Sequence, residues 1–139
     1  MIDETTILTD LNQALIAARN DEGFTAETLP IKFHGNGSFE VPNSGKYLET
    51  VFIPVGEQDR YYGANQVQRG LYRVILHWSF DQGGAYDPLT LIRSIVDRGF
   101  AKGKLTDNVT VQSRPKLMSL LESDTDIGYP MSIRFTSFA

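Results

Sequence analysis

The 139-residue sequence contains no cysteine. This absence excludes a disulfide framework, a thiolate metal site and cysteine catalysis. Long apolar runs are missing too, and no stretch approaches the roughly 20 apolar residues of a membrane span. The segment Met1–Glu4 is acidic because of Asp3 and Glu4, and it lacks the basic-then-apolar layout of a signal peptide, so we expect a soluble protein of the cytosol.

The overall composition is that of an ordinary soluble globule, with 41% apolar and 22% charged residues. A chain of this length predicts a single domain over residues 1–139, with enough buried surface for a core without cross-links.

The formal net charge of -4 hides an uneven distribution. Residues 1–59 carry 3 basic and 10 acidic side chains, residues 60–116 carry 9 and 4, and residues 117–139 carry 1 and 3. One interpretation is solvated faces of no particular role. The other is complementary patches that let copies of the chain, or two different partners, meet.

Hydrophobic periodicity predicts two helices and several short strands. One amphipathic helix spans about Thr5 to Arg19, and a second begins at the cap Asp87 and ends near Lys104. The predicted strands are Leu29–His34, Tyr47–Val55, Gly70–Phe80, Asn108–Arg114, Lys116–Glu122 and Met131–Phe138. This order predicts an α+β fold: a mainly antiparallel β-sheet with two helices packed on one side, in a single domain.

The strand Gly70–Phe80 has the strongest pattern. Its even-numbered residues form an apolar face that we assign to the core, and its odd-numbered residues form a mixed face. That mixed face is amphipathic enough to be covered by another element or by another subunit.

No motif predicts a catalytic, metal or cofactor site. His34 and His77 have no ligand at metal-binding spacing, and the loop at Gly35–Gly37 precedes no helix that would complete a phosphate loop. The acidic turn Glu122–Asp126 lacks the glycine of a calcium loop. Cations interleaved with aromatics in the basic middle block are typical of single-strand binding, but a sequence pI near 5.1 argues against nucleic-acid recognition.

Two loops carry exposed-looking aromatic or apolar residues. In the first, Phe39 and Val41 either tuck onto the core or are offered to a neighbour. The second is a polar connection, Gly56–Gln66, with Arg60, Tyr61 and Tyr62 at its centre. Each is either a simple connection or an interaction loop.

Weak motifs follow one another along the chain in a particular order. A short strand at 29–33 precedes a Gly/Asn/Pro loop with Phe39, an extended segment Tyr47–Pro54, a strand opening Arg69-Gly70, and Gly83-Gly84 before the second helix. Over roughly residues 4–138, this succession resembles the tail-terminator proteins of long-tailed phages and prophages.

The resemblance implies a structural protein, not an enzyme. Such proteins form rings, typically of six subunits, that cap the tail tube at its final length and then bind the head-tail connector or stopper protein. The implied partners are further copies of the chain, the tail tube protein and the connector, with DNA passing through the ring unread and no membrane involved. The implied location is the head-proximal end of the virion tail, and the host cytoplasm during assembly.

We expect the interface of such a ring to use aromatic, apolar and basic residues of the two loops and the basic block. These are Phe39, Val41, Arg60, Tyr61, Tyr62, Arg69, Arg73, Lys102 and Lys104. Two alternatives stay open. One is a tail-tube or head-tail connector subunit of the same assembly, and the other is a small ligand-binding or enzymatic α+β domain with a cleft near His77, Arg73 and Asp81.

Overall fold

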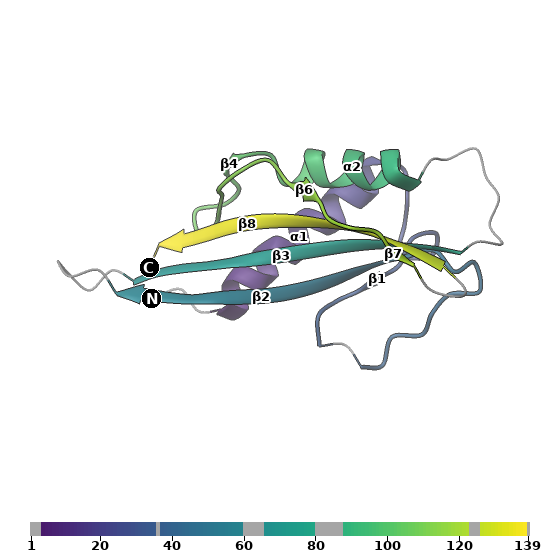
Figure 1. The fold of residues 1–139 in the computed structure, drawn as a ribbon, viewed down its shortest axis with the longest axis horizontal. Helices are drawn as coiled ribbons and strands as arrows, with labels where there is room; N and C mark the ends of the chain where they lie inside the picture. Colours follow the sequence, from purple (N-terminus) through teal and green to yellow (C-terminus); the bar gives the residue numbers. More distant parts are fainter. Residues whose placement is uncertain (1–3, 36, 60–65, 80–87, 123–125, 139) are drawn as a thin grey trace.

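The structure is a computed structural model that describes residues 4–35, 37–59, 66–79, 88–122 and 126–138. Two helices and eight strands follow one another within these ranges (Figure 1). In chain order they are α1 (Glu4–Asp21), β1 (Ile31–Lys32), β2 (Tyr47–Asp59), β3 (Gln66–Ser79), α2 (Pro88–Gly99), β4 (Gly103–Lys104), β5 (Thr110–Val111), β6 (Lys116–Leu117), β7 (Leu121–Glu122) and β8 (Asp126–Phe138).

All eight strands belong to one sheet, ordered β1-β2-β3-β8-β5-β4, with β6 and β7 also paired to β8. Every pairing is antiparallel except that of β1 with β2. With two helices on one side, the predicted α+β class and its mainly antiparallel sheet are confirmed (Figure 1).

The helices form because their apolar residues recur every three or four positions and meet the sheet. Ile7, Leu11 and Leu15 of α1 are fully buried, and so are the apolar residues of α2: Leu91, Ile92, Ile95 and Val96. The two helices approach closely at Gly99, where an added Cβ would lie 2.9 Å from the Cβ of Ala18. Gly99, which sequence alone marks only as a weak helix position, therefore allows the helix packing.

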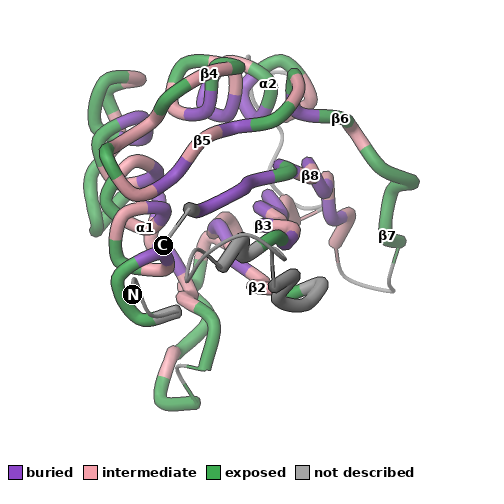
Figure 2. The backbone as a smooth tube through the Cα atoms, turned by 90° about the vertical axis from the view of Figure 1, so that its left-hand side faces the viewer, coloured by how far each residue is buried: buried purple, intermediate pink, exposed green. Residues whose placement is uncertain are grey.

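The face of the sheet toward the helices is the hydrophobic core, and we call it the core face. Tyr72, Val74 and Leu76 of β3 are fully buried there, which confirms the face assigned from sequence. β8 lies beside β3 and adds Ile133 and Phe135 to the same layer. In Figure 2 this buried layer lies between the strands and the two helices.

Several predicted strands are shorter in the structure. The strand expected over Leu29–His34 is only β1, the strand expected over Asn108–Arg114 is only β5, and Lys116–Glu122 divides into β6 and β7. These segments lie at the rim of the sheet, where backbone groups find other partners. The His34 amide, for example, donates to the Thr50 hydroxyl at 2.9 Å.

Other strands extend further than local patterning predicts. The connection expected over Gly56–Gln66 is shorter, because β2 continues to Asp59 and β3 begins at Gln66. A bulge between Pro54 and Gly56 keeps the two strands paired beyond the proline. Similarly, β8 begins at Asp126, five residues before the strand expected over Met131–Phe138.

Candidate functional site

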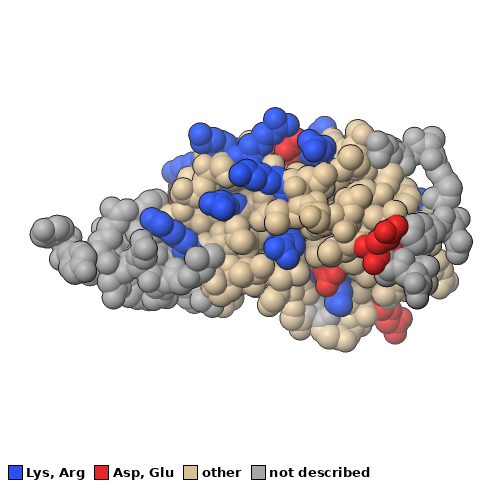
Figure 3. Space-filling model, viewed as in Figure 1, with Lys and Arg blue, Asp and Glu red and all other residues tan. Residues whose placement is uncertain are grey.

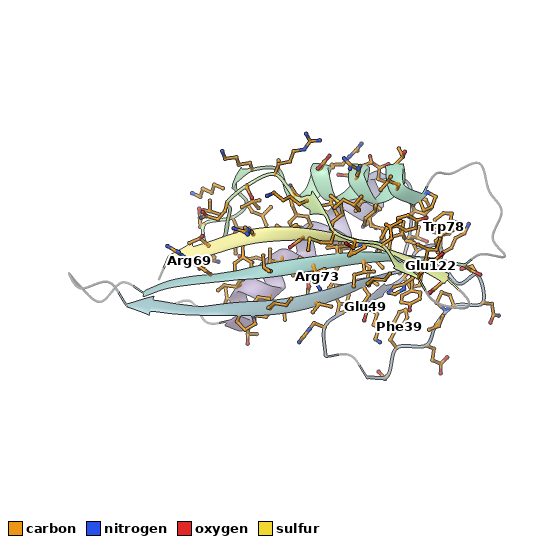
Figure 4. All side chains as sticks on the ribbon, viewed as in Figure 1. Phe39, Glu49, Arg69, Arg73, Trp78 and Glu122 are labelled. Atoms are coloured by element: carbon orange, nitrogen blue, oxygen red, sulfur yellow. The ribbon has the colours of Figure 1, made fainter. Side chains whose placement is uncertain are left out.

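The sheet has a second face, turned away from the helices, which we call the open face. The register places Arg69, Leu71, Arg73, Ile75 and His77 of β3 on it, because residues alternate between faces along a strand. Figure 4 shows Arg69 and Arg73 on the side of the ribbon toward the viewer, with α1 behind the sheet.

Side chains from the neighbouring strands join this face. Val51 and Ile53 of β2 pair with Arg73 and Leu71, and Arg134 of β8 pairs with Leu71 from the other side. Arg69 and Arg134 are therefore diagonal neighbours, which lie about 7–8 Å apart in a sheet. The open face combines aliphatic residues with arginines.

The arginines of the open face have no carboxylate among the residues that the structure describes. The ion pairs found in these ranges use Lys32, His77, Arg98, Lys104 and Arg114. The Nε atom of the partly buried residue Arg73 also has no hydrogen-bond partner there. Because a buried donor without a partner costs free energy, this arrangement favours a ligand or partner that supplies acceptors.

A groove of about 540 Å³ opens between β3 and the segment after β5. Arg69 and Arg134 border it, with Leu71 between them and Gln112 and Ser113 opposite. Its two exposed guanidinium groups and its aliphatic side chain suit an anion attached to an apolar group.

At the other end of β3, near His77, the polar side chains of the open face pair with one another. His77 Nε2 lies 2.8 Å from Glu49 Oε1, and His77 Nδ1 lies 3.4 Å from Asp126 Oδ2. The Tyr47 ring stacks on the imidazole at 4.4 Å between centroids. Burial first, and then the carboxylates of Glu49 and Asp126, raise the pKa of the Tyr47 phenol.

This cluster holds the loop between β1 and β2. The Phe39 ring packs on Tyr47 at 5.3 Å between centroids, so Phe39 tucks inward as one of the two sequence interpretations expected. Val41 does the opposite, with 61% of its surface exposed. Gly45, at φ 71° with Ser79 beside its Cα, closes the loop in a conformation that favours glycine.

The free edge of β2 is closed to further strands. β1 pairs only with Leu48 and Glu49, and beyond it the Phe52 amide donates to His34 Nδ1 at 3.2 Å. Pro54 then offers no amide for pairing. These features disfavour the addition of a further strand to β2 between Leu48 and Pro54.

Charge is unevenly distributed over the side of the molecule seen in Figure 3. Lys and Arg predominate over β8, the β4–β6 region and α2, although Asp97 and Asp107 pair with Arg114 and Lys104 there. Asp and Glu lie mainly toward β7 and the loop before β2, where Lys32 pairs with Glu49. The complementary-patch interpretation of the sequence blocks stays a prediction.

The structure separates the residues expected at an interface into three groups. Arg69 and Arg73 share the open face, and Phe39 and Val41 share the loop. The two lysines are exposed near β4, where Lys104 pairs with Asp107 at 2.9 Å, and Lys102 borders a separate hollow. Arg60, Tyr61 and Tyr62 lie outside the described residues.

Sequence reasoning missed Arg134 as a site residue. Alternation along the last strand already places it on the polar face, but nothing local indicates that this strand lies beside Arg69. An exposed apolar strip was missed as well, formed by Met118, Leu120 and Leu121 at 43%, 50% and 51% exposure. The sequence had placed all three in one strand over Lys116–Glu122, but the structure has only β6 and β7 there, and the three side chains are exposed.

Other kinds of site find little support in the described ranges. No group of three His, Asp or Glu residues there could hold a metal ion. His77, one residue of the cleft expected for a ligand-binding domain, is taken up by two carboxylates, and Asp81 lies outside the described residues. No helix in the described part of the chain is long and apolar enough to cross a membrane.

Comparison with known proteins identifies the fold and nothing finer. No family model matches the sequence, and no curated protein matches it. The solved structures that match include one with a TM-score of 0.71 at 18% identity, covering 99% of this chain and 96% of that chain. The name of that protein states no function, and at this identity the likeness shows a shared fold only.

Proposed function

We propose that this protein is a tail terminator: a subunit of a ring, of six copies as is typical of the family it resembles, that caps a phage tail tube and joins it to the head-tail connector. The observation that carries the proposal is the presence of two unlike contact surfaces on one small domain. A basic, partly aliphatic groove lies at one end of the open face, and an anchored loop with an exposed valine lies at the other end.

Such a pair of surfaces favours heterologous association, in which a patch on one copy meets a different patch on the next. Contacts of this kind close into rings when the rotation between copies divides a full turn. The uneven distribution of charge in Figure 3 would give the contact its direction. Further support is the order of weak motifs over residues 4–138, which resembles tail terminators.

The proposal assigns a structural role without catalysis or cofactor. Its partners are further copies of the chain, the tail tube protein and the connector or stopper protein. DNA passes through the ring without being read. The protein acts at the head-proximal end of the tail after assembly in the host cytoplasm.

The test is assembly of the purified protein alone and on preformed tubes of the cognate tail tube protein. Light scattering and electron microscopy are expected to show single closed rings, free or at one end of each tube. Unlimited cylinders of the protein itself would assign it to the tube, and rings that bind only the connector would assign it to the connector. A protein that stays monomeric in solution and leaves tube ends bare contradicts the proposal.

A further inference from the structure

The exposed tip of the loop before β2 complements the groove at the far end of the sheet in charge and in apolar character. Glu40 is exposed and forms no ion pair or hydrogen bond within the described residues, and Val41 beside it is the most exposed large apolar residue among them. The groove offers two exposed guanidinium groups with Leu71 between them.

The loop presents these two residues in a prepared conformation. Phe39 is packed on Tyr47, and the Gly45 amide donates to the Pro42 carbonyl at 2.9 Å. The anchoring contacts therefore lie on both sides of Glu40 and Val41. Both residues are exposed, and Glu40 forms no ion pair or hydrogen bond within the described residues. A segment already ordered in this way loses little conformational entropy when it binds.

The tip cannot reach the groove of its own chain. The loop is anchored at the level of His77, and the nearest groove residue of β3 is Leu71, six residues away. At about 3.3 Å per residue, roughly 20 Å of sheet separates them. In Figure 4, Phe39 and Arg69 lie at opposite ends of the sheet.

We propose that Glu40 and Val41 of one copy occupy the groove of the next copy, with the Glu40 carboxylate between Arg69 and Arg134 and the Val41 side chain against Leu71. This assignment rests on the proposed ring and names the contact that builds it. Carboxylate–guanidinium pairs give the contact strength and direction, and the aliphatic contact excludes water from them.

A second copy fits the groove better than DNA does. Phosphates would pair with the arginines but would leave the aliphatic residues between and beside them, Leu71 and Ile53, uncovered. A contact of one loop tip is also small, since stable protein interfaces bury at least about 1,000 Å². Each contact is therefore weak in a pair of copies, and ring closure makes it stable because every subunit is held twice.

A charge exchange tests the contact in rings. Glu40→Arg and Arg134→Glu are each expected to lower the ring population at least tenfold at low salt, and the double variant is expected to recover it. The matched control is Glu122→Arg, an equal charge change beside the exposed Leu121 on β7. The proposal is overturned if Glu40→Arg leaves the ring population unchanged. It is also overturned if Glu122→Arg, and not Glu40→Arg, restores rings to the Arg134→Glu protein.

A cross-link separates this inference from the proposed function, because the chain has no cysteine of its own. A Val41→Cys protein mixed with a Leu71→Cys protein is expected to form a mixed disulfide, at least fivefold more than a Leu121→Cys protein mixed with Leu71→Cys. If the cross-link forms but no rings do, the proposed contact is supported and the tail-terminator function is contradicted. If rings form without the cross-link, the proposed contact is contradicted and the tail-terminator function is supported. DNA binding that Arg134→Glu abolishes, without the cross-link, assigns the groove to phosphates and overturns the proposal.

Discussion

The two faces of β3 carry opposite chemistry on one strand. On the core face, Tyr72, Val74 and Leu76 are fully buried beneath the helices. On the open face, Arg69 is exposed, and Arg73 keeps a donor atom without a partner among the described residues. The core face is covered by the helices of the same chain, whereas we propose that a second copy covers part of the open face. Stability should therefore depend on the first face, and association should depend on the second.

Emptying the core face should have the largest effect on stability. Phe100 is fully buried, and its ring lies 5.7 Å from that of Tyr72. We expect Phe100→Ala to lower the free energy of unfolding by about 3–5 kcal/mol, because it leaves a cavity. Urea unfolding followed by circular dichroism measures this change. The control Arg93→Ala, on the exposed side of α2, should stay within about 0.5 kcal/mol. Similar losses in the two variants would contradict the division between faces.

A smaller loss is expected at Gly70, a glycine on the core face of β3. A Cβ at Gly70 would lie 2.6 Å from Phe135 Cζ and 2.8 Å from the Ile53 carbonyl oxygen. We expect Gly70→Ala to lower the free energy of unfolding by about 1–3 kcal/mol, because the ring or the strand must move. The matched control is Gly37→Ala, where nothing lies within 4 Å of an added Cβ. If the Gly70→Ala protein were as stable as that control, the close approach of the Phe135 ring to Gly70 of β3 would be contradicted.

The smallest effect concerns two tyrosines, one on each face. Burial raises the pKa of Tyr72, and its hydroxyl lies 2.5 Å from Asn12 Oδ1. The folded state therefore keeps a proton that the unfolded state loses above about pH 10, so stability is full below that pH and falls as the pH rises. The slope is about 1.4 kcal/mol per pH unit for each such tyrosine. Tyr72→Phe should flatten this alkaline loss, measured by urea unfolding between pH 9 and 11.

The salt dependence of tyrosine titration should differ between Tyr47 on the open face and Tyr72 on the core face. The raised pKa of Tyr47 comes partly from Glu49 and Asp126, so added salt should bring its titration closer to that of an ordinary tyrosine. The difference between absorbance titrations of the wild type and of Tyr47→Phe isolates this group. The corresponding difference for Tyr72→Phe should be insensitive to salt, because burial is its main cause. If salt changes the titration of both tyrosines equally, the claim that nearby carboxylates raise the pKa of Tyr47, and burial that of Tyr72, is contradicted.

Local patterning predicted the fold class and most of the core. The buried stripe of α2 and the even-numbered face of β3 lie where their periodicities indicate, because burial selects apolar residues at the repeat of the element. The rim strands were predicted less well. β1, β5, β6 and β7 are two residues each, and pairing with β2 or β8, not propensity, decides where they begin and end.

The candidate site was predictable only in part. Phe39, Val41, Arg69 and Arg73 were singled out from sequence, and the structure sorts them into an anchored loop and an open face. Their role in assembly stays a prediction. Arg134 was not found, because no local signal links it to a residue 65 positions earlier in the chain.

By itself, the sequence determined the two helices, the alternating strands, the absence of cysteine chemistry and the separation of charge along the chain. These properties depend on residue type and on neighbours within a few positions. Only the tertiary structure decided that β8 lies beside β3, that Glu49 and Asp126 enclose His77, and that Arg134 completes a groove with Arg69. The reason is physical: strand pairing joins residues far apart in sequence, and the alternation that predicts a strand does not specify its neighbour.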